Sequence, residues 1–322
     1  MTTFEIGVSH RSRPHLLADL VELILAVKYD NVSELSQAAF QIILKEMPGA
    51  DDDNSANDAL TDAQAKDNIE LALEDCWNHL EYRQAVFGKH YPFHIDGDRL
   101  LWRRAKPTLD CQMYLFLLFC SRLRSFTPQR VRGTAASAFV GMCREAMRAL
   151  ATDNANVRIF DANSDDRKSH YGTDLRKALR VLARELAAHQ IHEVEIDKAS
   201  SSGDARLDII ASYGFNDPGA GTFSILAQCA ARETEWPSKT LEASPRNLLP
   251  YFTLLNNPEN LLFIPVCFRT STGDWVRAAD TNGCILIDRV RILELLSQRG
   301  NAARTQFKKE CSPILETLSA AA

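Results

Sequence analysis

Two short apolar runs on either side of a turn-rich stretch constrain the fold of this chain more than any other feature. Residues 207–211 are Leu-Asp-Ile-Ile-Ala, and residues 223–227 are Phe-Ser-Ile-Leu-Ala. Residues 213–221, between them, are rich in Gly, Asn, Asp and Pro, which favour turns. This pattern predicts two neighbouring strands joined as a hairpin. The first strand would start with Asp208, and the second would end with Gln228.

The polar side chains at these two strand ends carry the oxygen atoms that a hard divalent cation binds. Asp208 offers a carboxylate and Gln228 offers an amide carbonyl. Mg²⁺ and Mn²⁺ both accept such oxygen ligands. A cation held there would polarise a bound oxygen and lower the pKa of a bound water. The two side chains are therefore a candidate ligand pair for such a cation.

The segment Gly203-Asp204 to Asp208, followed by Gln228-Cys229-Ala230, resembles the core of the PD-(D/E)XK nuclease superfamily. The similarity is greatest to its Mrr-like restriction-endonuclease branch, in which a strand with G-D-x-G-x-D precedes a strand ending in Q-x-K. The resemblance implies that Asp208 and Gln228 bind the metal ion, with the backbone carbonyl of Cys229 as a further ligand. Asp204 matches the preceding Asp of the family. The implied fold class is α/β, a restriction-endonuclease-like mixed sheet flanked by helices.

Ala230 departs from the family pattern, because the family places a catalytic lysine at this position. Lys239, in Glu-Trp-Pro-Ser-Lys, could extend back to the site from the next helical segment. Lys198, upstream of the first strand, is the second candidate. We favour Lys239 as the replacement, and Lys198 remains the alternative.

A predicted amphipathic helix over residues 171–190 precedes the hairpin. Its leucines recur at helical spacing: Leu175, Leu179, Leu182 and Leu186. In the family, the first core helix often carries an acidic residue directed at the metal, and Glu185 is the candidate here. A solvated helix face is the alternative for this glutamate.

Charge is unevenly distributed along the 322 residues, although the net charge is only −5. Residues 51–75 are strongly acidic, whereas residues 99–148 carry ten Arg or Lys residues against Asp110 and Glu145. Such a basic block could neutralise DNA phosphates. The candidates for DNA binding are Arg103, Arg104, Arg130 and Arg132. Solvated helix faces, in part paired with the acidic block, are the equally weighted alternative.

The cysteines and the apolar runs indicate a reduced, cytoplasmic compartment. The eight cysteines form no C-x-x-C pair and show no zinc-ligand spacing. Several lie inside apolar runs, as expected for reduced core residues. The longest apolar run, Met113–Cys120, is too short to cross a bilayer. We therefore expect no membrane association.

A polar stretch at residues 152–170 divides the predicted elements into two groups. Before it the pattern is mostly helical, with one hairpin signal at Asp96-Gly97. After it helices and strands alternate, and residues 191–196 alternate like a strand. We expect residues 1–152 to form a regulatory or targeting domain and residues 153–322 to form the restriction-endonuclease-like domain.

Two functions from different classes remain open. The first is a metal-dependent DNA endonuclease, which the resemblance implies to be a prokaryotic restriction or antiphage-defence effector. The second, suggested by Ala230, is a binding or scaffold subunit of a defence complex with a decayed catalytic site. The resemblance leaves open a partner protein of that system and a homo-oligomeric state. Thiol chemistry through Cys229 is a third reading with little support, because no histidine lies nearby in sequence.

Overall fold

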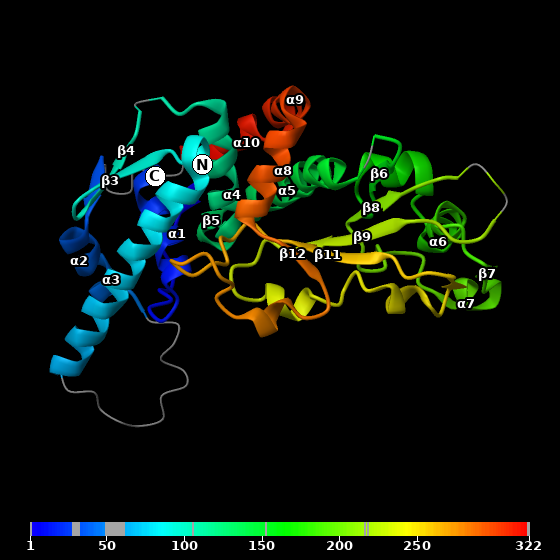
Figure 1. The fold of residues 1–322 in the computed structure, drawn as a ribbon, viewed down its shortest axis with the longest axis horizontal. Coiled ribbons are helices and arrows are strands. Elements are labelled where there is room, and N and C mark those ends of the chain that lie inside the picture. Colours follow the sequence, from blue (N-terminus) through cyan, green and yellow to red (C-terminus); the bar gives the residue numbers. More distant parts are fainter. Residues whose placement is uncertain are drawn as a thin grey trace.

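The computed structural model describes residues 2–27, 33–48, 62–104, 106–151, 153–215, 217 and 219–320. The chain forms an elongated α/β molecule with a helical end and a sheet end (Figure 1). The first part of the acidic block, residues 51–61, and the expected domain boundary at residue 152 lie outside the described residues. In the described part of the chain, no helix has the length and apolar character needed to cross a membrane.

A five-stranded mixed sheet forms the centre of the sheet end, with strand order β12-β11-β9-β8-β6. The strands are β6 (Asn156–Ile159), β8 (Ile209–Ser212), β9 (Ser224–Cys229), β11 (Glu259–Phe263) and β12 (Ile285–Ile287). β6, β8 and β9 are successively antiparallel, whereas β11 is parallel to both β9 and β12. The expected mixed sheet is therefore confirmed at the level of its architecture.

The predicted hairpin is confirmed as the β8–β9 pair, with Ile209 opposite Ala227 and Ser212 opposite Ser224. Alternate residues of these strands contribute to two different cores. Ile209 and Ala227 belong to the core that includes α5 (Gln129–Leu150), and Ile210 belongs to the core that includes α6 (Leu175–Glu185). Helices therefore cover both faces of the hairpin, and for this reason both strands are almost entirely buried.

The helical end is built around α1 (Pro14–Ala26), of which twelve residues are buried. α3 (Asp62–Phe87) and α4 (Leu109–Ser121) pack against α1, and α2 (Gln37–Glu46) packs on α3. A small antiparallel sheet accompanies these helices, with strand order β2 (Glu34–Ser36), β4 (Arg99–Trp102) and β3 (Phe93–Asp96). The predicted Asp96-Gly97 hairpin is confirmed, because Gly97 takes the positive φ of 57° that its tight turn requires.

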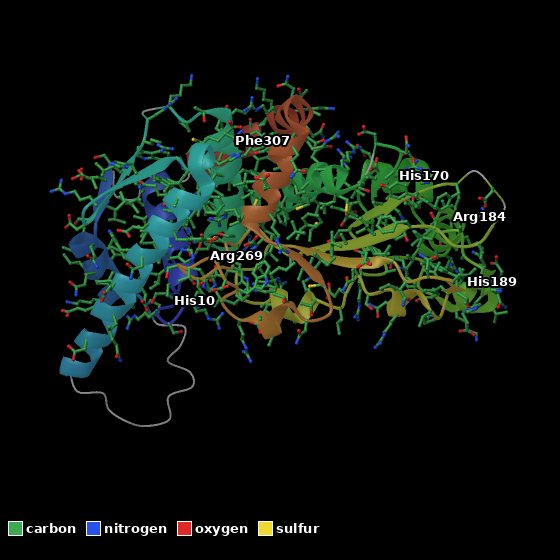
Figure 2. The ribbon with its side chains drawn as sticks, viewed as in Figure 1. His10, His170, Arg184, His189, Arg269 and Phe307 are labelled. Carbon is green, nitrogen blue, oxygen red and sulfur yellow. The ribbon has the colours of Figure 1, made fainter. Side chains whose placement is uncertain are left out.

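Three C-terminal helices return to the helical end: α8 (Arg289–Arg299), α9 (Asn301–Glu310) and α10 (Ser312–Ser319). They pack against α4 and α5. Phe307 on α9, labelled in Figure 2, contacts Phe116 of α4 with 6.0 Å between ring centroids. One hydrophobic core thus contains Phe139 from before residue 152 and Phe263 from after it. The division at residue 152 marks a change of pattern along the chain and does not separate two cores.

Shorter elements connect these parts. The pairs β1–β5 (Thr3–Phe4 with Phe126–Thr127) and β7–β10 (Gln190–Ile191 with Phe252–Thr253) are two-residue ladders. The strand expected over residues 191–196 is wrong, because this run forms the short helix α7 (Glu193–Lys198). Acidic residues in its first turn and Lys198 in its last turn complement the helix dipole, and Ile196 is the buried contact.

Candidate metal centre

Asp208 and Gln228 lie at the same end of the β8–β9 hairpin. Asp208 directly precedes β8, and its backbone N–H donates to the carbonyl of Ala227 (2.9 Å). Gln228 is the penultimate residue of β9. Both side chains line one pocket. The structure therefore brings together the two predicted ligands, as the hairpin pattern required.

A third strand adds another acidic residue to this end of the sheet. β6 pairs with β8, and the N–H of Phe160 donates to the carbonyl of Asp208 (2.7 Å). This contact places the next residue, Asp161, beside Asp208. Carboxylate oxygens of Asp161, Asp204 and Asp208 lie within 4.8 Å of one another. We call these three residues the acidic cluster.

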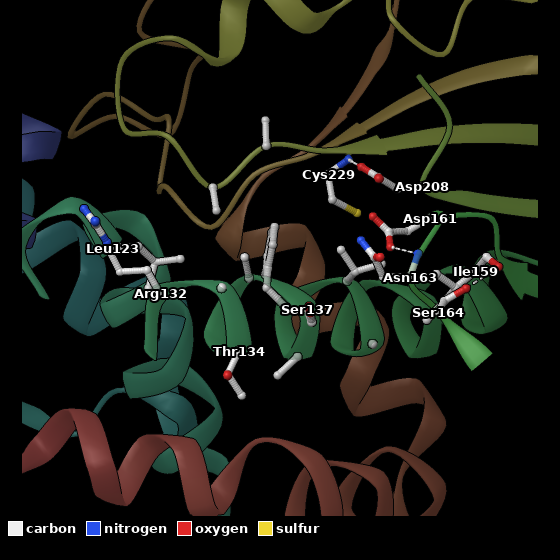
Figure 3. Close-up of a pocket in the computed structure, with 18 of the residues that line it drawn as sticks. Leu123, Arg132, Thr134, Ser137, Ile159, Asp161, Asn163, Ser164, Asp208 and Cys229 are labelled. Carbon is white, nitrogen blue, oxygen red and sulfur yellow. Dashed lines mark hydrogen bonds between the residues drawn. The ribbon is translucent and has the colours of Figure 1, made fainter. Parts of the chain in front are cut away.

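Backbone N–H groups orient each carboxylate of the acidic cluster. The N–H of Asn163 donates to Asp161 Oδ1 (2.8 Å), and the N–H of Arg206 donates to Asp204 Oδ1 (2.8 Å). The N–H of Cys229 donates to Asp208 Oδ2 (2.7 Å; Figure 3). One oxygen of each carboxylate is thereby fixed, which leaves the other oxygen able to accept a further ligand.

Burial gives Asp208 an unusual affinity for protons. Removal from water raises the pKa of Asp208 from 3.8 to about 7, against the lowering effect of the hydrogen bond from Cys229. The nearby charges of Asp204 and Asp161 raise this pKa further, and Lys239 lowers it. Near neutral pH, a cation would therefore compete with a proton for the Asp208 carboxylate.

Two residues of the acidic cluster, Asp161 and Asp208, line a cavity of about 920 Å³ between α5 and the sheet. Figure 3 shows Asp161 and Asp208 at one end of this cavity and Arg132, on the first turn of α5, at the other. Gln228 is 8% exposed, and its Oε1 has no hydrogen-bond partner within the described part of the chain. Because a buried polar atom is normally paired, this amide oxygen is a candidate for an unfilled ligand position.

Of the two candidate lysines, the structure brings only Lys239 to the pocket. Lys239 ends the short 3₁₀ helix Trp236–Lys239, whose Trp236 is buried against Phe268 with 4.6 Å between ring centroids. Its Nζ donates to Glu242 (3.2 Å). Lys198 lies outside the pocket lining and pairs with Glu195 on the surface of α7 (2.8 Å).

Glu185 is not brought to the acidic cluster. Its carboxylate accepts hydrogen bonds from Ser212 Oγ (2.7 Å), Arg158 (3.2 Å) and His170 (3.1 Å). Ser212 is the last residue of β8, so Glu185 lies at the opposite end of that strand from Asp208. The predicted role of Glu185 as a metal ligand therefore has no support from its position, and its surroundings are polar partners rather than open solvent.

Asp161 is the acidic residue that sequence reasoning missed. It was grouped with the polar residues of the boundary stretch, although it directly follows the short apolar run 157–160. An acid directly next to a short apolar run was the signal available: Asp161 follows such a run, and Asp208 stands at the start of another.

Cys229 contributes its backbone N–H to the site rather than its thiol. The thiol contacts Cys143, and burial raises its pKa well above the ordinary value. A protonated, buried thiol is a poor nucleophile, so this environment argues against thiol chemistry. Metal binding through the backbone carbonyl of Cys229 stays a prediction.

The four arginines predicted to bind DNA fall into two places. Arg130 and Arg132 lie on the first turns of α5, and Arg132 lines the pocket of the acidic cluster. Arg103 and Arg104 line a separate cavity of about 440 Å³ at the helical end, where Arg103 donates to the carbonyl of Gly88 (2.9 Å). The pocket of the acidic cluster gains three other arginines that were not singled out: Arg124, Arg144 and Arg232.

Comparison with known proteins yields no relative for this chain. No family model matches it, and no curated protein or solved structure matches it either. The chemistry of the site therefore rests on its own residues. Three carboxylates and an unpartnered amide oxygen form a set of hard donors that fits Mg²⁺ or Mn²⁺.

Proposed function

We propose that this protein is a divalent-metal-dependent DNA endonuclease whose active site is the acidic cluster with Gln228 and Lys239. One observation carries the proposal: three carboxylates converge within 4.8 Å of one another. Two of them, Asp161 and Asp208, line a pocket together with Gln228, whose buried amide oxygen has no hydrogen-bond partner among the described residues. Like charges this close repel one another unless a proton or a cation intervenes. The donor set favours a cation.

The residues around the pocket have separable roles in this proposal. Asp161, Asp204, Asp208 and the Oε1 of Gln228 would hold Mg²⁺ or Mn²⁺. A bound ion supplies Lewis-acid polarisation of the phosphodiester and a more acidic water. The N–H of Cys229 fixes the orientation of Asp208, and Lys239 adds a positive charge beside developing negative charge on phosphate. Arg132, at the far end of the cavity, is positioned to contact a neighbouring phosphate.

The sheet topology supports a restriction-endonuclease-like fold. An antiparallel β6–β8–β9 meander carries the acidic cluster, and β11 then joins β9 in parallel, with helices on both faces. This agrees with the expected PD-(D/E)XK resemblance, in which an Asp and a Gln on adjacent strands bind the metal. A restriction or antiphage-defence effector of this kind would act on DNA in the prokaryotic cytoplasm.

A specific observation keeps a second function in view. Ala230 is 2% exposed and packs in a core with Trp236 and Leu262, so the position that holds the family's lysine is apolar here. Lys239 is also engaged with Glu242. A metal-binding but non-cleaving subunit of a defence complex would have these properties.

The deciding experiment separates metal binding from cleavage. Isothermal titration with Mn²⁺ and plasmid nicking in Mg²⁺ or Mn²⁺ are measured for the wild type, Asp208→Asn and Lys239→Ala. Asp197→Asn, which removes an exposed carboxylate on α7, is the control.

We expect Asp208→Asn to lower both Mn²⁺ affinity and cleavage by on the order of 100-fold. Lys239→Ala should lower cleavage with little effect on Mn²⁺ affinity, and Asp197→Asn should change neither. A wild type that binds Mn²⁺ without cleaving DNA would favour the binding subunit. A wild type that does neither would eliminate the site.

A further inference from the structure

A buried guanidinium lies directly behind the acidic cluster. Arg167 is 0% exposed and belongs to the single π-helical turn Arg167–Tyr171. It donates from Nε to the carbonyl of Gly172 (2.8 Å), from Nη1 to Phe160 (3.0 Å) and from Nη2 to Gly203 (3.2 Å). Its guanidinium also stacks on the Phe160 ring, 4.5 Å from the centroid.

Two of these three carbonyls belong to the residues that immediately precede Asp161 and Asp204. The carbonyl of one residue and the N–H of the next share one rigid peptide plane. A hydrogen bond to the carbonyl of Phe160 or Gly203 therefore fixes the plane from which the acidic residue departs. One side chain thus controls the relative placement of two loops that are more than 40 positions apart in the sequence.

The loop that carries Asp204 needs such a restraint. Gly203, Ala205 and Arg206 have positive φ values of 109°, 52° and 65°. For Ala205 and Arg206 this left-handed conformation is unfavourable, and it persists only where surrounding contacts impose it. The contacts present are the Arg167 bond to Gly203 and the bonds that Asp204 makes to the following backbone.

The charge of Arg167 is also placed to act on the cluster. No ion pair joins its guanidinium to a carboxylate within the described ranges, so its hydrogen bonds go to neutral carbonyls. Burial lowers the pKa of Arg167, and the negative charges of Asp204 and Asp161 oppose this more than those of other groups. A fixed cation behind the cluster reduces the repulsion between carboxylates that face the pocket from the other side.

We propose that Arg167 is a positioning residue for the metal centre: it clamps the Phe160 and Gly203 carbonyls and thereby sets the spacing of Asp161 and Asp204 for a shared divalent cation. This inference rests on the proposed metal site and adds to it a residue that touches neither metal nor DNA. A lysine at this position keeps the charge but cannot bond three separated carbonyls at once.

The test compares Arg167→Lys with Arg122→Lys. Arg122 is also buried and also donates to backbone carbonyls, those of Ile6 and Val8, but neither carbonyl precedes a residue of the acidic cluster. Mn²⁺ affinity is measured by titration calorimetry and by the electron paramagnetic resonance of free Mn²⁺, without DNA. Urea unfolding of each variant is measured in parallel.

We expect both lysine variants to lose stability and only Arg167→Lys to lose Mn²⁺ affinity, by about 10- to 100-fold. If Arg167→Lys folds and keeps wild-type affinity, or if Arg122→Lys loses as much, the inference is overturned. A wild type without Mn²⁺ binding overturns the metal site itself, which is a separate result.

A second variant decides the matter if Arg167→Lys does not fold. Gly203→Ala places a side chain at an exposed loop position where φ is 109° and the nearest atom to the added Cβ is 3.9 Å away. The backbone there must change, which moves the carbonyl that Arg167 holds. We expect a folded variant with about tenfold weaker Mn²⁺ binding, and unchanged binding would overturn the inference.

Discussion

The two ends of the molecule bury acidic residues in opposite ways. At the helical end, Asp19 and Glu22 on α1 meet two buried guanidiniums. Arg83 pairs with Asp19 (2.7 Å) and Glu22 (2.8 Å), and Arg289 pairs with Asp19 (2.9 Å). At the sheet end, no ion pair joins any carboxylate of the acidic cluster to a cation in the described ranges.

A comparison of Asp19 with Asp208 shows how ion-pair partners change the pKa of a buried carboxyl group, because the two side chains are buried to a similar extent. Asp19 is 2% exposed and Asp208 is 7% exposed. Burial raises the pKa of each, but the guanidiniums of Arg289 and Arg83 reverse the effect at Asp19 and lower its pKa to about 2. The pKa of Asp208 instead rises to about 7. The difference between the two pKa values therefore comes from the neighbouring charges and not from the extent of burial.

The difference distinguishes two uses of a buried acid. Two acids and two guanidiniums cancel at the helical end, and the hydroxyls of Tyr91 and Tyr114 donate to Glu22 (2.8 and 2.7 Å). Such a network of ion pairs and hydrogen bonds links α1, α3, α4 and α8. The acidic cluster has no such ion-pair partners in the described part of the chain, so its carboxylates can still bind a cation. Carboxylates of this kind are typical of functional sites.

The largest effect on stability should come from removing one guanidinium from the ion-pair network of Asp19, Glu22, Arg83 and Arg289, which we call the compensated network. Arg289→Met leaves Asp19 and Glu22 with one guanidinium in a dry core, because Arg289 is 0% exposed. Removing one partner of a buried ion pair costs about 3–5 kcal/mol. Urea denaturation should show this loss in the free energy of unfolding. The control, Arg277→Met, removes an exposed guanidinium and should change the value by less than about 0.5 kcal/mol. A loss below 1 kcal/mol for Arg289→Met would contradict the comparison.

Removing a carboxylate from the acidic cluster should have the opposite effect and increase the free energy of unfolding. The folded pKa of Asp208, about 7, exceeds its ordinary value of 3.8, so its contribution to stability is lost as pH rises between these values. Asp208→Asn removes this penalty and should raise the free energy of unfolding by about 2–4 kcal/mol at pH 8, with EDTA present. At pH 4 the gain should vanish. Urea denaturation at both pH values measures this, and a variant less stable than the wild type at pH 8 would refute the assignment.

Local sequence was sufficient for the hairpin and for the positions of the first two candidate ligands. Apolar runs and turn residues are short-range signals, and they placed Asp208 and Gln228 at one end of the β8–β9 pair. Asp161 joins them only because β6 pairs with β8, across a separation of about 50 residues. Glu185 illustrates the converse, since helix periodicity fixes its face but not which end of the sheet that face meets.

The compensated network could not be predicted from the sequence, because its partners are far apart along the chain. Arg83 and Glu22 are 61 positions apart, and Arg289 and Asp19 are 270 positions apart. Each charge alone looks like a surface residue of an amphipathic helix. Only the packing of α1 between α3, α4 and α8 buries them together, and tertiary contacts of this kind leave no local pattern.

A smaller effect on stability is expected from His15 at the helical end. It should appear as the pH falls, whereas the effect of Asp208 appears as the pH rises. His15 on α1 is 3% exposed, and burial lowers its pKa from 6.5 to about 3. Asp19 raises this pKa, whereas Arg83, Arg13 and His10 lower it further. The unfolded chain therefore binds a proton at His15 below pH 6.5 that the folded chain rejects, and stability falls as pH decreases towards 3.

At pH 5, His15 should account for about 2 kcal/mol of lost stability relative to pH 7.5. His15→Gln cannot take up this proton, so its unfolding free energy should fall less over the same interval, by about that amount. His79, also held neutral by burial, keeps the same direction of pH dependence in both proteins. Urea denaturation at pH 7.5 and pH 5 gives the comparison. Equal losses in the wild type and in His15→Gln would mean that His15 is hydrated, and the helical end would then not be the dry, charge-balanced core that distinguishes it from the acidic cluster.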